Sequence, residues 1–504
     1  MAGSGRARVK SIEQSIADTD EPDSKLRKDL GPLDLVVFGV AVAVGAGIFT
    51  LTAQVAGDFA GPSVALAFVL AAIACGLAAL CYAEFASTVP VAGSAYTFSY
   101  ATFGELVAWI IGWDLVLEFG FAAAVVAKGW SLYLAQFLGL IGLPVSKASF
   151  EIAGITVDWG ALLIVAALTA VLVFGVKLSS RVSQVITAIK VLVVLLVVVV
   201  GIGYVKAANY SPYIPPPTVG SGGAGGSVWT QSLVSLAGGS TTSHFGVYGL
   251  LAAAGLVFFA FIGFDVVATT AEETRNPQRD IPWGIIGSLV VITILYVAVS
   301  TVLTGMVNYT QLATGPDGKT ATLATAFQLN GVGWAATVIS LGALAGLTTV
   351  VLVLLLGQTR VLFAMSRDGL LPRGLARTGS HGTPVRITLI VGGLSAFIAA
   401  FVPTSDLESL VNIGTLFAFV LVSLGVLVLR KTRPELPRAF RTPLVPVVPI
   451  LAVLACAWLM VNLTVQTWAR FVVWMALGFI VYFGYSRGHS RFARPESRAS
   501  DSVG

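Results

Sequence analysis

Lys190 is the only charged residue in a long apolar run of the chain, which extends from Ile186 to Val200. A charged side chain inside a membrane costs about 2.5–3.5 kcal/mol on insertion scales, so such residues are usually retained for a function. A lysine held at that depth keeps or releases its proton according to the oxygen atoms that face it. This residue therefore predicts a process that is switched by protonation.

Glu118 is an acidic residue in a comparable position. It follows Gly104 by 14 residues, which corresponds to about 20 Å of helix. Lys190 follows Arg181 by nine residues, or about 14 Å. Both side chains are therefore expected near the middle of a membrane. They form either a structural ion pair or separate elements of a proton route, and the sequence leaves both readings open.

The composition indicates what must position these groups. The chain has 504 residues, of which 56% are hydrophobic and 11% charged, whereas soluble domains are about 25% charged. We therefore predict an all-α polytopic membrane protein with twelve transmembrane helices, each on the order of 20 residues, the third and eighth unusually long. The predicted helices centre near Val42, Val69, Leu117, Val165, Leu195, Val257, Val291, Leu347, Val391, Val420, Val453 and Leu477.

Basic residues predict the orientation of these helices, because lysine and arginine are enriched in cytoplasmic loops. Twelve crossings from a cytoplasmic tail at 1–32 return the chain to a cytoplasmic tail at 488–504. The opposite loops then carry only Lys147, Lys206, Lys319 and Arg470. The net charge of +5 is thus a marker of topology and not of a nucleic-acid partner. The inner loops carry Arg275, Arg279, Arg367, Arg373, Arg377, Arg386, Arg430, Lys431, Arg433, Arg438 and Arg441.

Residues 33–487 form one helical membrane domain in this prediction, with an external Pro/Gly/Ser-rich loop at about 207–246. Its three cysteines, Cys75, Cys81 and Cys456, all fall in apolar stretches and predict packing rather than disulfides. We expect no metal and no cofactor. The polar loops offer no nucleophile or metal cluster, so we also predict that the chain is not an enzyme.

Two of the predicted helices contain glycines near mid-membrane. Gly45 and Gly47 lie in the first, and Gly263 lies beside Asp265 in the sixth. Glycine weakens a helix by roughly 1 kcal/mol relative to alanine. Helices one and six begin two halves of five helices each, and interrupted helices at matching places are typical of an inverted repeat. The alternative is that these glycines only permit close helix packing.

An interrupted helix leaves backbone N–H and C=O groups free at membrane depth, which is tolerated where they line a polar cavity. Such a cavity fits a zwitterion, whose carboxylate meets N–H groups and whose ammonium group meets carbonyl oxygens. Asp265 has two readings here. It either contacts an amino group directly or bonds the backbone that the interruption frees.

Four motifs in order along the chain carry a resemblance to a known family. On them the chain resembles the amino acid-polyamine-organocation transporter superfamily, and within it bacterial members of the cationic amino-acid transporter branch. The resemblance covers the chain from about Lys28 to Leu463. The motifs are Gly45–Phe49, Pro90–Tyr96, Phe259–Asp265 running on to Pro277, and Gln358–Arg360 running on to Pro372.

The resemblance implies a fold like that of the bacterial leucine transporter, with five plus five inverted helices followed by two more. It also implies that the substrate lies on the main chain of both interrupted helices, and that Phe259 acts as a thin gate. The substrate carboxylate would lie on Ala43, Ala46 and Gly47, with Gly45 beside them, and the amino group on the carbonyls of Phe259, Ala260 and Ile262.

The same resemblance assigns two residues to proton coupling. Lys190 matches a lysine that, in proton-coupled members, occupies the place of a sodium ion in sodium-coupled relatives. Glu118 matches an acid of the third helix. The chain departs from the family at Ala46, where threonine is common. A contact from that hydroxyl to the substrate is therefore replaced by main chain or water.

Leu347 and Thr348 stand where family members contact the substrate side chain. An apolar Leu347 favours small neutral amino acids over cationic ones, because a buried cation needs a paired acceptor. The leading expectation is proton-coupled symport of amino acids across the plasma membrane, with the proton as the coupling ion. The alternatives are an amino-acid or polyamine exchanger and a transceptor without net flux. Expected partners are an amino acid and the bilayer, with a monomer, a weak oligomer and a small membrane-protein partner left open.

Overall fold

The computed structural model describes residues 30–88, 95–96, 99–100, 103–143, 148–152, 155–175, 180–219, 228–237, 243–313, 320–377 and 383–490. Residues 1–29 and 491–504 lie outside this part of the chain, as do stretches of the predicted external loop and most of the Pro90–Tyr96 motif. The domain boundaries predicted there remain predictions.

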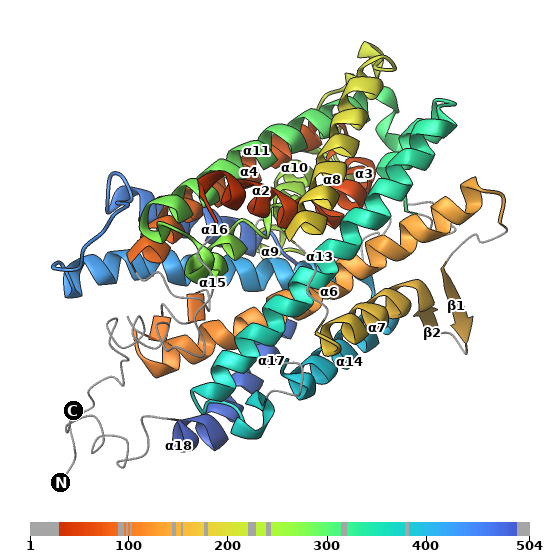
Figure 1. Cartoon of the computed structure of the whole chain (residues 1–504). Coiled ribbons are helices and arrows are strands. Elements are labelled where there is room, and N and C mark those ends of the chain that lie inside the picture. Colours follow the sequence, from red (N-terminus) through yellow and green to blue (C-terminus); the bar gives the residue numbers. More distant parts are fainter. Residues whose placement is uncertain are drawn as a thin grey trace, which may run out of the picture.

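Helices dominate the described part of the chain (Figure 1). The helices are α2 (Pro32–Ala43), α3 (Thr52–Val55), α4 (Val64–Thr88), α6 (Glu105–Leu140), α7 (Trp159–Val173), α8 (Ser180–Ile202), α9 (Leu233–Ala237), α10 (Gly246–Val257), α11 (Pro277–Met306), α12 (Leu323–Leu329), α13 (Gly333–Arg367), α14 (Val385–Phe401), α15 (Thr404–Thr432), α16 (Val447–Val461), α17 (Val465–Val481) and α18 (Arg487–His489).

Eight segments of the described chain are long and apolar enough to cross a membrane. Four shorter apolar helices, α2, α7, α14 and α16, accompany them. Each predicted centre lies in a different apolar helix, and the chain is a multi-pass membrane protein. The predicted length of the third and eighth helices is confirmed, because α6 and α13 have 36 and 35 residues.

Two helices organise the centre of the bundle. The long helices α6 and α13 pack along each other, and α15 also packs against α6 (Figure 1). Helix α11 packs against both α2 and α4, while α7 and α14 form a further pair. The interrupted segments after α2 and α10 lie among these helices, so the long helices position the site described below.

Two short antiparallel ribbons depart from the all-α expectation. Strand β1 (Ser149–Ile152) pairs with β2 (Ile155–Asp158), and β3 (Thr218–Val219) pairs with β4 (Ser243–His244). The first ribbon is rich in aromatic and β-branched residues, which favour strands. It ends at Asp158, whose carboxylate accepts a hydrogen bond of 3.0 Å from Ala161 N and so caps α7.

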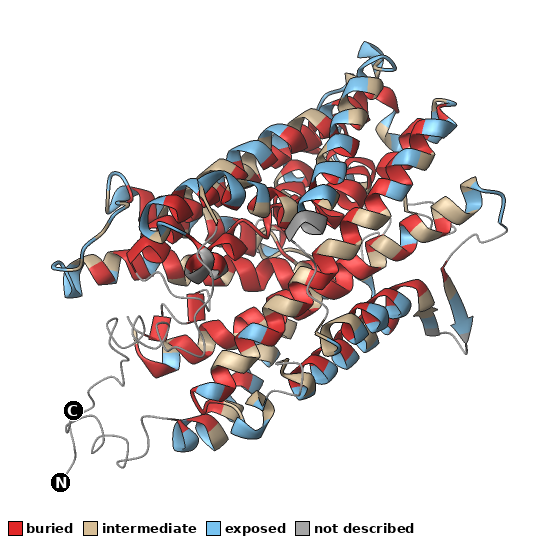
Figure 2. Cartoon of the chain, in the orientation of Figure 1, coloured by how far each residue is buried: buried red, intermediate tan, exposed pale blue. Residues whose placement is uncertain are grey.

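Burial follows the predicted membrane environment. Buried residues line the contacts between helices, whereas exposed residues lie on outer faces such as that of α8 (Figure 2). Leu192 on α8 and Ile480 on α17 are both more than half exposed. Such faces would be unfavourable in water but match lipid hydrocarbon.

Candidate functional site

The first interruption lies where the glycines predict it. Helix α2 ends at Ala43, the chain bends at Val44 and Gly45, and a π-helical turn follows from Gly47 to Leu51. Gly47 packs directly on Ala260, and a β-carbon at Gly47 would collide with the backbone of Ala260. Glycine is therefore required here by the close approach of two main chains.

The second interruption follows α10. A 3₁₀ turn covers Phe258–Phe261, Ile262 is extended, and Gly263 has a φ of +124°, which only glycine adopts readily. A carboxylate oxygen of Asp265 accepts a hydrogen bond of 3.1 Å from Gly263 N. Of the two readings of Asp265, the structure has the one in which it bonds the freed backbone.

The two interruptions border one cavity. Six of the predicted substrate contacts line it, namely Ala43, Gly45, Ala46, Gly47, Phe259 and Ile262. The other lining residues are all apolar: Val42 from α2, Ala122 and Val126 from α6, and Val350 and Leu354 from α13. The cavity thus combines main chain from broken helices with an aliphatic wall.

Three predicted contacts lie apart from the lining. Ala260 packs behind Gly47. Leu347 is buried beside Gly129 of α6, and the Thr348 hydroxyl donates to the Leu344 carbonyl at 2.7 Å. The wall that α13 contributes is instead formed by Val350 and Leu354. A substrate contact by Leu347 or Thr348 stays a prediction.

Tyr296 of α11 joins the two interruptions, and the sequence analysis missed it. Its hydroxyl lies 2.7 Å from the carbonyl oxygen of Ala43 and 2.8 Å from that of Ala260. One hydroxyl proton serves these two acceptors, which lie on different broken helices. A tyrosine in an apolar helix carries no sequence signal for such a role.

Other side chains satisfy the remaining freed carbonyls. Thr50 donates to Ala46 at 2.6 Å, and Tyr133 donates to Phe49 at 2.7 Å. At the second interruption, the side-chain amide of Asn412 donates to the Gly255 carbonyl at 3.0 Å. Side chains thus bond several of the carbonyls around the interruptions, as membrane depth requires.

Lys190 is fully buried in α8 and donates from Nζ to the carbonyl oxygen of Ala41 in α2. Its aliphatic stem lies against Gly346 of α13, where a β-carbon would collide with it. The lysine thus contacts both the helix that precedes the first interruption and one of the central helices. Ala41 O is one of the carbonyls that the end of α2 leaves without a helical partner.

Glu118 and Asp114 form a second buried polar group. Within the described chain, Glu118 Oε1 and both carboxylate oxygens of Asp114 make no hydrogen bond. The charged neighbours of Glu118 are Asp114 and Asp265, and it also faces Thr415. The structure therefore does not pair Glu118 with Lys190.

Asp114 belongs to a stripe along α6. Asp114, Glu118, Ala122 and Val126 are spaced by four residues, so they share one face of the helix. The last two line the cavity, and the first two continue the stripe away from it. This spacing was available in the sequence, but Asp114 was not singled out.

Lys128 of α6 lies ten residues beyond Glu118, a position from which a lysine side chain can extend to the membrane interface. Its ammonium group instead lies 3.7 Å from the carboxylate of Asp158, and its side chain is 12% exposed. Asp158 also accepts a hydrogen bond of 2.5 Å from Ser131. An ion pair at the start of α7 therefore accounts for this lysine.

Comparisons with known proteins show the family of the chain. A family model described as amino acid permease matches residues 30–484. The branched-chain amino acid permease BcaP of Bacillus subtilis is 46% identical over 96% of this chain and 98% of its own length. The methylthioribose transporter of the same organism is 43% identical over 96% and 98%. The vacuolar cationic amino acid transporter 4 of Arabidopsis thaliana is 37% identical over 85% of this chain and 67% of its own.

The matched family and these relatives are permeases and transporters, not enzymes. The family match covers nearly the whole described chain and includes both interruptions, Lys190 and Glu118. The chain belongs to the amino acid permease family of the amino acid-polyamine-organocation superfamily.

Proposed function

We propose that the chain moves neutral aliphatic amino acids across the plasma membrane by proton-coupled symport. The observation that carries the proposal is the cavity between the two interruptions, which offers backbone polar groups and otherwise only apolar side chains. Main-chain N–H and C=O groups suit the carboxylate and ammonium ends of an amino acid. The aliphatic wall suits its side chain.

The cavity wall favours neutral over cationic substrates. A lysine or arginine side chain would place its charge against Val126, Val350 and Leu354, and a buried cation without an acceptor is costly. The name of the Bacillus subtilis relative supports branched-chain amino acids as members of the substrate set. The second relative makes methylthioribose a compound that any substrate screen must include.

Lys190 supplies the coupling in this proposal. A protonated Lys190 holds the Ala41 carbonyl of α2 while its stem rests on α13. Loss of the proton removes the charge-assisted hydrogen bond and releases α2 near the first interruption. Glu118 adds a second protonation site on the α6 stripe, whose other end lines the cavity. Asp265 supports the second interruption rather than carrying substrate.

We further propose twelve crossings arranged as two inverted halves of five helices and two more. The eight long and four shorter apolar helices support that number. Helices α2 and α10 then open the two halves, and each is followed by an interruption. An even number of crossings places both termini on the same side of the membrane, and the basic inner loops make that side cytoplasmic in this proposal. Single cysteines introduced near Phe245 and near Pro434, labelled from either side of the membrane, test this orientation.

The decisive experiment is uptake into liposomes that contain the purified full-length protein, with an imposed inward proton gradient and no sodium. We expect concentrative uptake of leucine, valine or alanine and little of arginine or lysine. Uptake only against an internal amino acid, independent of the gradient, would establish the exchanger instead. Binding without flux would establish a transceptor. Preferred uptake of arginine would overturn the reading of the cavity.

Two substitutions at Lys190 test its role. Lys190→Ala should bind substrate but lose accumulation driven by the gradient. Lys190→Arg should fail to couple as well, because guanidinium keeps its proton at working pH. Equilibrium binding and gradient-driven uptake are measured on the same preparation. Full concentrative uptake by Lys190→Ala would reduce this lysine to a structural counter-ion.

A further inference from the structure

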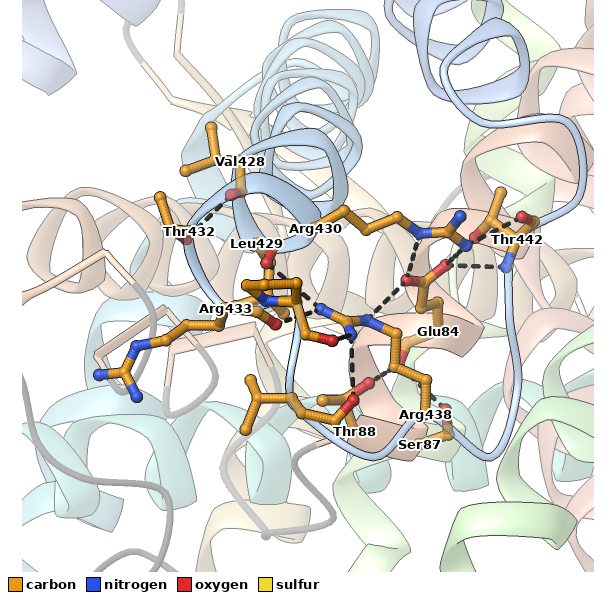
Figure 3. A network of polar contacts seen from close by, with 12 residues as sticks. Glu84, Ser87, Thr88, Val428, Leu429, Arg430, Thr432, Arg433, Arg438 and Thr442 are labelled. Atoms are coloured by element: carbon orange, nitrogen blue, oxygen red, sulfur yellow. Dashed lines mark hydrogen bonds and ion pairs between the residues drawn. The ribbon is translucent and has the colours of Figure 1, made fainter.

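The connection between α15 and α16, residues 433–446, is fixed to α4 by one buried carboxylate (Figure 3). Glu84 accepts two hydrogen bonds from Arg430, of 3.0 and 2.8 Å, and one of 2.7 Å from Thr442 N. Arg438 Nε lies 3.4 Å from the same carboxylate. These contacts hold both the beginning and the end of the connection in place.

Arg438 also closes the end of α15. Its guanidinium donates to the carbonyl oxygen of Leu429 in the last turn of α15 and to that of Arg433 directly after the helix. It further donates to the carbonyls of Pro434 and Leu436. The connection is therefore a defined platform and not a loose loop.

The platform carries more positive charge than its carboxylates compensate. Arg430 and Arg438 share Glu84, while Lys431, Arg433 and Arg441 are exposed. Glu435 lies 3.9 Å from Arg433, and both side chains are more than half exposed, so this pair contributes little. Figure 3 shows Arg433 turned away from Glu84. Three net positive charges thus remain on this part of the chain, whose backbone is held by the contacts of Glu84 and Arg438.

Two exposed apolar side chains follow these charges in the sequence. Leu444 is 77% exposed and Val447, the first residue of α16, is 52% exposed. They follow Arg441 by three and six residues. A ligand that satisfies both sets must combine an anionic group with hydrocarbon. In a membrane protein, such a combination occurs where a lipid headgroup meets its acyl chains.

We propose that the α15–α16 connection and the helix ends beside it bind the headgroup of an anionic phospholipid through Lys431, Arg433 and Arg441, with Leu444 and Val447 against its acyl chains. Occupancy stabilises the platform, and Glu84 passes this stabilisation to α4. The ligand is identified by charge complementarity and by the apolar rim beside the charges. The inference is independent of the transported substrate.

The test uses the purified full-length protein in an uncharged detergent. Phosphatidylglycerol or phosphatidylcholine is added at equal concentration, and the melting midpoint is measured. A ligand of the folded state raises the midpoint by mass action. We expect phosphatidylglycerol to raise it by several degrees more than phosphatidylcholine does. The triple variant Lys431→Gln, Arg433→Gln, Arg441→Gln should lose most of this difference while melting normally in phosphatidylcholine.

The matched control removes the same charge from other exposed positions, by Arg275→Gln, Arg279→Gln and Arg377→Gln. It should keep the phosphatidylglycerol effect. Equal loss in both triple variants would show that the effect depends only on the total charge of the protein. No loss in the first variant would show that these three residues do not bind the lipid, and either result would overturn the proposal. Glycerol 3-phosphate should not raise the midpoint. A full effect from that soluble anion would contradict a lipid site.

Discussion

Glu84 and the groups around the helix interruptions are all buried, but they are partnered very differently. The carboxylate of Glu84 is shared by Arg430, Arg438 and a backbone N–H. At the interruptions, Lys190 has one backbone acceptor, and Asp114 makes no hydrogen bond within the described chain. All the polar atoms of the Glu84 carboxylate have partners, whereas Lys190 and Asp114 have few partners and can exchange them.

This difference separates polar groups that hold the fold from polar groups that can respond. A buried charge with all partners in place is costly to disturb, because removing one partner leaves the others uncompensated. A buried group with few partners costs little to alter in the fold but depends on protonation or ligand for its state. Substitutions in the two regions should therefore affect different measurements.

The largest effect on stability is expected for Glu84→Ala. The substitution leaves Arg430 and Arg438 facing each other without their carboxylate, and breaking a buried pair in this way costs about 3–5 kcal/mol. Thermal melting in detergent measures it. Glu435→Ala is the control, and its exposed pair with Arg433 should be worth at most about 0.5 kcal/mol. Similar melting midpoints for Glu84→Ala and Glu435→Ala would show that the buried contacts of Glu84 do not stabilise the fold more than an exposed ion pair does.

Gly47→Val should weaken binding. The added side chain must displace Ala260 and so deform the main chain beside the cavity, and we expect a loss of affinity of about a hundredfold, or about 3 kcal/mol. Equilibrium binding of leucine measures the change, with expression as the check on folding. Gly393→Val is the control, because a β-carbon there meets nothing within 4 Å. Unchanged affinity in Gly47→Val would remove this backbone from the site.

Tyr296→Phe should have an intermediate effect. Its hydroxyl reaches the carbonyls of Ala43 and Ala260, so its loss leaves buried acceptors unbonded at about 1–2 kcal/mol. We expect weaker substrate binding together with a lower melting midpoint. Tyr210→Phe removes an exposed hydroxyl that donates to Thr301 at 2.8 Å and should change neither. The same affinity and melting midpoint in both variants would show that the Tyr296 hydroxyl does not link the two interruptions.

The smallest effect on stability is expected for Asp114→Asn. The carboxylate has no hydrogen bond to lose, so a neutral isostere should change stability by less than about 1 kcal/mol. Its effect should appear in the pH profile of uptake, because a titrating group has been removed next to Glu118. A loss of several kcal/mol would reveal a partner and place Asp114 among the groups that hold the fold.

The sequence predicted the helices well, because the length of the apolar runs and the positions of the glycines can be read directly from the sequence. All predicted centres fall in apolar helices, and both interruptions lie at the glycines. The ribbon from Ser149 to Asp158 was missed, since two strands of four residues produce little periodic signal between long apolar runs. Its β-branched residues were the available clue.

The site was predicted less completely than the fold. The main-chain lining of the cavity was expected from the interruptions and the family resemblance, but Ala122, Val126, Val350 and Leu354 resemble every other apolar residue of a buried helix. Periodicity cannot say which of them face a cavity when all faces are apolar. Tyr296 was missed for the same reason, as its role depends on two carbonyls far away in the sequence.

The contact between Gly47 and Ala260 has a mechanical consequence. Gly47 has no side chain to separate the two main chains, and the Tyr296 hydroxyl is bonded to both. The segments after α2 and α10 therefore behave as one unit. Tilting either segment alone would separate this packing and break a hydrogen bond. The cavity should therefore open toward each side of the membrane through a concerted rotation of both segments, as a rigid body against α6 and α13.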